Sequence, residues 1–74
     1  MPTQLLTTPA TELLAHLRDL YLERALAELQ GLAADTAYGA DLEAEIAACR
    51  AAYVGAAVTE IATLRARLSA PLAG

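Results

Sequence analysis

Seventy-four residues allow at most one small domain, and the single cysteine, Cys49, rules out an intramolecular disulfide. Nine acidic residues against five basic ones give a net charge of −4, which argues against general nucleic-acid binding, because that needs a basic face. Every stretch of 18 residues is interrupted by charge or polarity, so a membrane span is not expected either.

The chain opens with residues 1–8, which lack apolar periodicity and contain three threonines and a proline, so we interpret them as an extended arm. Thr8 is the expected N-cap of a first helix, with Pro9 at its first position. Strong helix formers continue from there, interrupted only by Gly31. The sequence therefore predicts a first helix over about 9–34.

The next segment, "ADTAYGAD", is the one internal loop candidate, and we expect the loop at about 35–40. Gly39 suits an unusual backbone angle, and Asp41 is the preferred N-cap of the second helix. A start at Asp35–Thr36 with a kink at Gly39 is the alternative.

The second helix is expected over about 41–69, with Pro71 stopping it before a tail at 70–74. Two helices of similar length joined by a short loop favour an antiparallel pairing. The predicted fold is thus all-α: a two-helix hairpin over 9–69 that assembles into a four-helix bundle or docks on a larger assembly.

The second helix carries a regular apolar seam at helical spacing. Its members are Leu42, Ile46, Cys49, Tyr53, Ala57, Ile61, Leu64 and Leu68. Beside the seam lies a stripe of small residues that includes Ala48, Ala52 and Gly55. Small side chains let two helix backbones approach closely, and a mid-helix glycine costs about 1 kcal/mol relative to alanine. The stripe therefore predicts close contact with another helix, although alanine is also the best filler of exposed helix positions.

The leucines of the first helix do not form one stripe. At about 100° per residue, a first group points one way and a second group is rotated well away from it. The first group is Leu13, Leu17, Leu20 and Tyr21, and the second is Leu22, Leu26 and Leu29. One partner helix cannot cover so wide an arc. Both groups and the small-residue stripe are therefore the predicted interface residues.

A polar stripe on the first helix offers the one candidate for metal chemistry. Glu12, His16, Asp19 and Glu23 share a face at steps of four, three and four. Carboxylates and histidine at such spacing hold metals in helical bundles. A di-iron site needs Glu-x-x-His, however, and this stripe lies opposite the leucines, so a solvated polar face is the main interpretation. Cys49 is interpreted as a small buried hydrophobe.

The sequence contains no phosphate-binding loop, zinc spacing or catalytic triad, so no cofactor is predicted and the chain is expected to be non-enzymatic. The expected function is a structural or interaction module that binds itself or a larger protein assembly, for example as a minor component of a phage or other multi-subunit particle. The expected location is the cytoplasm or such a particle. The alternatives are a small acidic regulatory binder that masks a partner's groove, and a metal-binding bundle.

Overall fold

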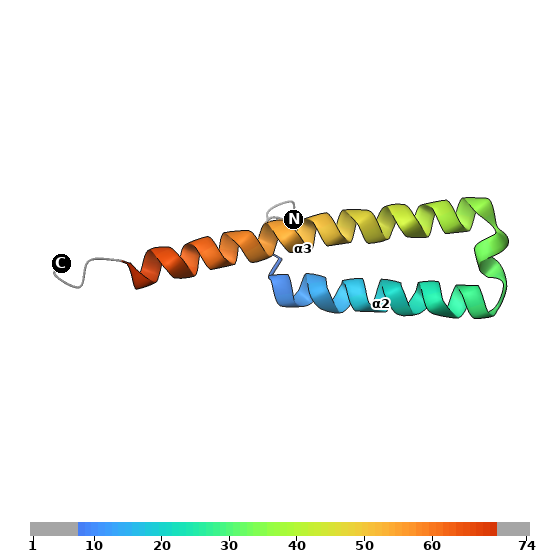
Figure 1. Ribbon diagram of the computed structural model, residues 1–74, viewed down its shortest axis with the longest axis horizontal. Helices are drawn as coiled ribbons and strands as arrows, with labels where there is room; N and C mark the ends of the chain where they lie inside the picture. Colours follow the sequence, from blue (N-terminus) through green and yellow to red (C-terminus); the bar gives the residue numbers. More distant parts are fainter. Residues whose placement is uncertain (1–7, 70–74) are drawn as a thin grey trace.

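The computed structural model describes residues 8–69, which form an antiparallel helical hairpin (Figure 1). Its elements are the α-helix α2 (Ala10–Leu29), the short 3-10 helix η1 (Leu32–Ala34) and the α-helix α3 (Thr36–Leu68). The all-α hairpin expected from the sequence is confirmed. Most of the expected N-terminal arm and the whole tail at 70–74 lie outside the described residues.

Helix α2 begins one residue later than the sequence predicts, because its cap position is held by Pro9 and not by Thr8. Pro9 has an extended backbone (φ −65°, ψ 150°), and its carbonyl accepts the first intrahelical hydrogen bond from the Leu13 amide at 3.2 Å. Proline has no side-chain oxygen to offer the first free amide. That amide, of Ala10, donates instead to Oε2 of Glu60 in α3 at 2.7 Å. The start of α2 is thus capped by the other helix.

Helix α2 ends at Leu29, about five residues earlier than expected. Gly31 has a φ of 76°, in the left-handed region where a helix terminates and where side chains other than glycine are disfavoured. The prediction that the helix passes through this glycine was therefore wrong, and the connection occupies 30–35 instead of 35–40.

Helix α3 starts at Thr36, so the preferred cap at Asp41 was also wrong, and the alternative start is the observed one. The Asp35 side chain accepts a hydrogen bond from the Tyr38 amide at 3.0 Å, which satisfies an amide of the first turn. Asp41 lies in the second turn, and Gly39 is a helical residue without the positive φ expected of it.

These boundaries make the two helices unequal, with 20 residues in α2 and 33 in α3, against about 25 and 29 expected. At ~1.5 Å per residue their lengths are roughly 30 and 50 Å. Helix α3 consequently projects well past the start of α2 (Figure 1). Residues 61–68, which follow the Glu60 cap, are called the overhang below.

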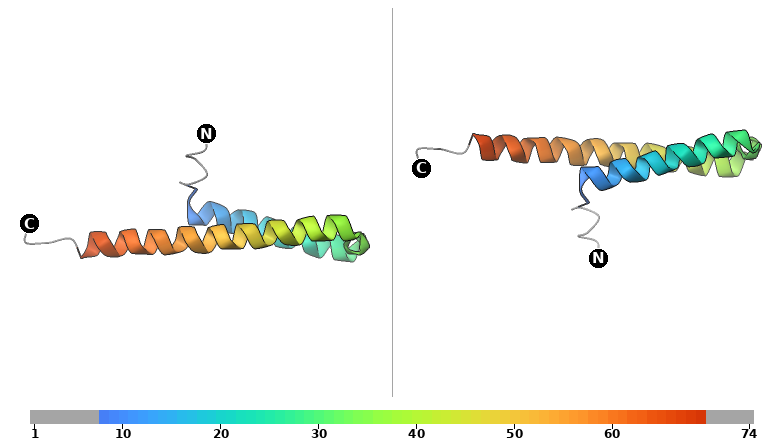
Figure 2. Two further views of the ribbon diagram at one scale, coloured as in Figure 1. Left: turned by 90° about the horizontal axis from the view of Figure 1, so that it is seen from above. Right: turned by 90° about the horizontal axis from the view of Figure 1, so that it is seen from below.

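The core lies between the helices, around the middle of their paired length. It consists of Leu17, Leu20, Leu42, Ile46 and Cys49, with Tyr21 and Tyr38 packed against it. The helices cross at a shallow angle instead of running parallel (Figure 2), so they pack closely over only part of their length. This is a small core for a free-standing domain.

Candidate interaction surface

Polar contacts between the helices occur along the length of the hairpin, and two of them lie near the loop. Arg24 forms an ion pair with Glu43 at 3.1 Å, and the Tyr38 hydroxyl donates to Glu23 at 2.7 Å. The hydrogen bond to that carboxylate raises the pKa of Tyr38, because a tyrosinate would be repelled by it. Both contacts lie at the exposed edge of the hairpin, where such pairs add little stability, so the register depends mainly on the buried core.

The apolar seam of α3 follows α2 only as far as α2 extends. Leu42, Ile46 and Cys49 are buried, and Tyr53 is half-buried. The remaining large members, in the overhang, are exposed. They are Ile61, Leu64 and Leu68. One continuous pattern in the sequence is therefore core in its first half and open surface in its second.

On α2, the two leucine groups separate as their angles predict. Leu17 and Leu20 are buried against α3 inside the hairpin, and Leu13 and Tyr21 are half-buried. These four residues face α3 of the same chain, so the buried pair cannot also contact a partner. The second group, Leu22, Leu26 and Leu29, is exposed, with Leu29 reaching 84%. We call this second group the outer face of α2.

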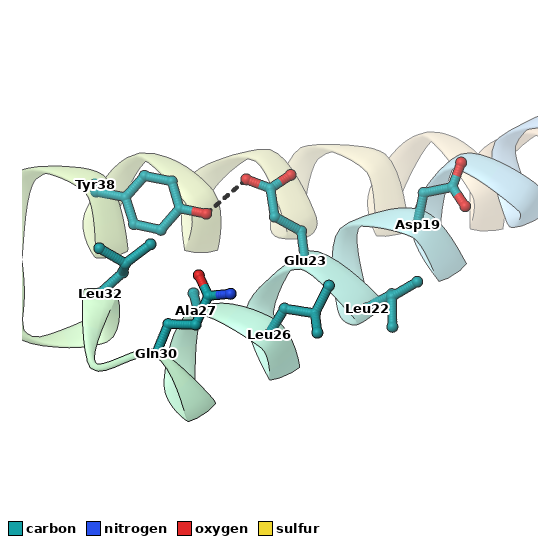
Figure 3. A pocket seen from close by; sticks show the side chains of 8 residues that line it. All are labelled: Asp19, Leu22, Glu23, Leu26, Ala27, Gln30, Leu32 and Tyr38. Atoms are coloured by element: carbon teal, nitrogen blue, oxygen red, sulfur yellow. Dashed lines mark hydrogen bonds between the residues drawn. The ribbon is translucent and has the colours of Figure 1, made fainter.

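The outer face of α2 borders a groove of about 380 Å³ near the loop (Figure 3). Its lining residues come from α2, the connection and the start of α3. They are Asp19, Leu22, Glu23, Leu26, Ala27, Gln30, Leu32 and Tyr38. The walls are mainly apolar, and the two charged groups are both carboxylates. The groove therefore suits an apolar partner segment that carries positive charge.

A second exposed row lies on α3 and leads into the overhang. Its residues follow one another at steps of three and four. They are Val54, Val58, Ile61, Leu64 and Leu68. Two of them, Val54 and Val58, lie beside the seam, and neither belongs to the interface predicted from the sequence. Steps of three and four place this row on one side of the helix.

The predicted close helix contact at the small-residue stripe does not occur within the hairpin. Ala48, Ala52 and Gly55 are all exposed. A Cβ placed at Gly55 would meet no atom within 4 Å, so α2 does not approach the backbone there. Contact of this stripe with a separate chain stays a prediction.

The polar stripe of α2 is not gathered into a metal site. Glu12, His16, Asp19 and Glu23 are all exposed. Within residues 8–69, no group of three or more His, Cys, Asp or Glu side chains is placed to hold a metal ion. The metal-binding hypothesis for these four residues thus gains no support. Cys49 is buried in the core, where its thiol lies 3.5 Å from the Leu13 carbonyl oxygen.

The residues that sequence reasoning missed are those that depend on where α2 starts and stops. Glu60 was not assigned a role, although it caps α2 across the hairpin. Leu32 lines the groove because α2 ends at Leu29 and the chain turns at Gly31, so Leu32 belongs to the connection and not to the helix. The sequence did contain a signal for these boundaries. Gly31 is a residue type that ends helices, and Asp35, four residues later, is one that caps the start of the next helix.

Comparisons with protein-family models, with curated proteins and with solved structures find no match for this chain. Neither helix among the described residues combines the length and apolar character that a bilayer crossing requires. The exposed apolar surface and its charges are therefore the features of this chain that bear on its function.

Proposed function

We propose that this chain is a non-enzymatic helical interaction module that associates with copies of itself or with a larger protein assembly. In the cell it would act in the cytoplasm or within a particle assembled there, and a minor component of a phage or other multi-subunit particle is one such role. With a net charge of −4, nucleic acid is not among the proposed partners.

The observation that carries the proposal is the amount of apolar surface left open by so small a core. Within residues 8–69, nine large hydrophobic residues are exposed, against a core cluster of five buried residues. Burying one such side chain fully is worth about 1.5–3 kcal/mol, so covering even a few would rival the stability of a small domain. Contiguous apolar patches on soluble proteins usually mark interfaces.

Sedimentation equilibrium over a range of concentrations, with circular dichroism at the same concentrations, tests this proposal. The chain has a mass of 7.7 kDa, so self-association would give species of at least twice that value. The midpoint of thermal unfolding should fall on dilution as the species dissociate, because the isolated hairpin is less stable than its assembly. A fully helical 7.7 kDa monomer with a stable, concentration-independent unfolding transition would refute self-association.

A regulatory binder is the second candidate, and the overhang favours it. Its eight helical residues carry an apolar row that no other helix of the described chain, 8–69, covers, and they resemble the amphipathic segments that fill a partner's groove. A soluble partner recovered at fixed stoichiometry, together with no self-association of the purified chain, would support this candidate over the first.

A further inference from the structure

The two unpartnered surfaces lie at opposite ends of the hairpin. The Ala10 amide donates to Glu60, which marks where α2 begins beside α3. Beyond that point Ile61 and Leu68 continue the apolar seam of α3, and both side chains are exposed. The outer face of α2 and its groove lie near the loop, at the other end (Figures 1 and 3).

The two surfaces match in length and spacing. The overhang spans eight residues, 61–68, and the outer face of α2 also spans eight, 22–29. Each covers about 12 Å of helix. The outer-face leucines stand at steps of four and three, and the overhang's apolar residues at steps of three and four. Rows of this kind interdigitate when two helices pack side by side.

The two surfaces also match in charge. Arg65 and Arg67 are the charged residues of the overhang, and neither side chain has a hydrogen bond or ion pair with any residue in the described range 8–69. The groove is bordered by Asp19 and Glu23, and no basic side chain lines it. A carboxylate accepts several hydrogen bonds, so Glu23 can keep its bond to Tyr38 and still receive an arginine.

We propose that the occupant of the groove is the overhang of a second copy of this chain, in a two-fold dimer of antiparallel hairpins. Turning one hairpin end for end brings each overhang beside the loop end of the other, so both grooves are filled at once. The overhang then runs parallel to the α2 that it covers, with Ile61 near Leu22 and Leu68 near Leu29. Arg65 comes within reach of Glu23.

Such a contact is isologous and closed, so it yields a four-helix dimer and not a filament. It buries the overhang and the outer face of α2 together, which no rearrangement of one chain achieves. This inference rests on the proposed self-association and names its geometry.

A reciprocal charge reversal tests the geometry. One variant carries Arg65→Glu and Arg67→Glu, and the other carries Asp19→Arg and Glu23→Arg. Each variant alone places like charges across both contacts, so its self-association should weaken by about tenfold or more. Mixed in equal amounts, the two should form a heterodimer, because both contacts then pair opposite charges. Sedimentation and a tag-based pull-down between the variants measure this.

A matched control carries Asp41→Arg and Glu45→Arg, which reverse the same number of charges at exposed positions of α3 that line neither the groove nor the overhang. This control should dimerise like the unchanged chain. If the unchanged chain dimerises but neither reversal weakens it, or if mixing restores nothing, the proposed geometry is wrong while self-association stands. If the unchanged chain is a monomer at all concentrations, self-association itself fails.

Discussion

Helix α3 contains two stretches of similar composition and opposite environment. In the stretch that faces α2, Ile46 is 3% exposed, whereas Ile61 in the overhang is 58% exposed. Both isoleucines belong to the same apolar seam in the sequence. Burial along α3 is therefore set by how far α2 extends beside it, and not by the apolar character of the residues of α3.

The reach of α2 is limited at both ends by local backbone chemistry. Pro9 has an extended backbone at its start, and Gly31 takes a left-handed conformation just after its end. Twenty residues between these points cannot cover a helix of 33. Part of α3 is unpaired because Pro9 and Gly31 limit the length of α2.

The largest difference between the two stretches is expected when the isoleucine of each one is replaced by alanine and the free energy of unfolding is compared. Ile46→Ala removes buried methyl groups and leaves a cavity, so it should lower the free energy of unfolding by about 2–4 kcal/mol. Ile61→Ala should change it by less than about 0.5 kcal/mol in dilute solution. Urea unfolding followed by circular dichroism at one low concentration measures both. Equal losses would mean that the overhang is already buried at that concentration.

Two aspartate variants test where α3 begins at the loop end of the hairpin. Asp35→Ala removes the acceptor of the Tyr38 amide and should cost about 1 kcal/mol. Asp41→Ala, at the position that the sequence favoured as the cap, should cost less than about 0.5 kcal/mol. Thermal unfolding of the two variants side by side measures the difference. A larger loss for Asp41 would place the start of the helix six residues later.

Glu60 marks the border between the paired and unpaired stretches. Glu60→Ala leaves the Ala10 amide without its acceptor and removes a negative charge from the start of α2, so it should cost about 0.5–1.5 kcal/mol. Glu60→Gln, which keeps an acceptor oxygen, should retain part of the stability. Glu45→Ala, at an exposed position on the same helix, is the control and should be close to neutral. Equal effects of the two alanine variants would contradict the cap.

Gly55 gives the smallest expected effect, and the one with the opposite sign. A Cβ there meets no atom within 4 Å, and alanine is the better helix former, so Gly55→Ala should stabilise the hairpin by up to about 1 kcal/mol. Comparing unfolding in dilute solution with sedimentation at high concentration separates folding from association. A variant that is more stable yet associates poorly would show that another chain approaches the small-residue stripe.

Much of the architecture could be predicted from the sequence because it depends on local rules. Helix formers without alternation predicted two helices, and the angular spread of the α2 leucines predicted that one partner helix cannot cover them all. The structure decided which group is covered: Leu17 and Leu20 are buried inside the hairpin, and Leu22 and Leu26 are exposed. The reason is geometric: a helix fixes the direction of each side chain, so the sequence alone determines which residues share a face.

The helix ends at the loop were harder to predict, because the sequence around each end is compatible with two different boundaries. Gly31 is tolerable inside a helix or ideal just after one, and both Asp35 and Asp41 make good caps. An error of about five residues at the loop moved the register of the pairing. It also hid the unequal lengths of the helices, and with them the overhang.

The helical class, the faces of each helix and the excess of apolar surface follow from the sequence alone, because they depend on residue spacing and intrinsic propensity. Three features emerge only when the helices pack: which part of the α3 seam is core, the capping of α2 by Glu60, and the placement of an acidic groove and a basic overhang at opposite ends. These features join residues as far apart in the chain as Ala10 and Glu60. Their positions depend on how two helices of unequal length align, which spacing within either helix does not specify.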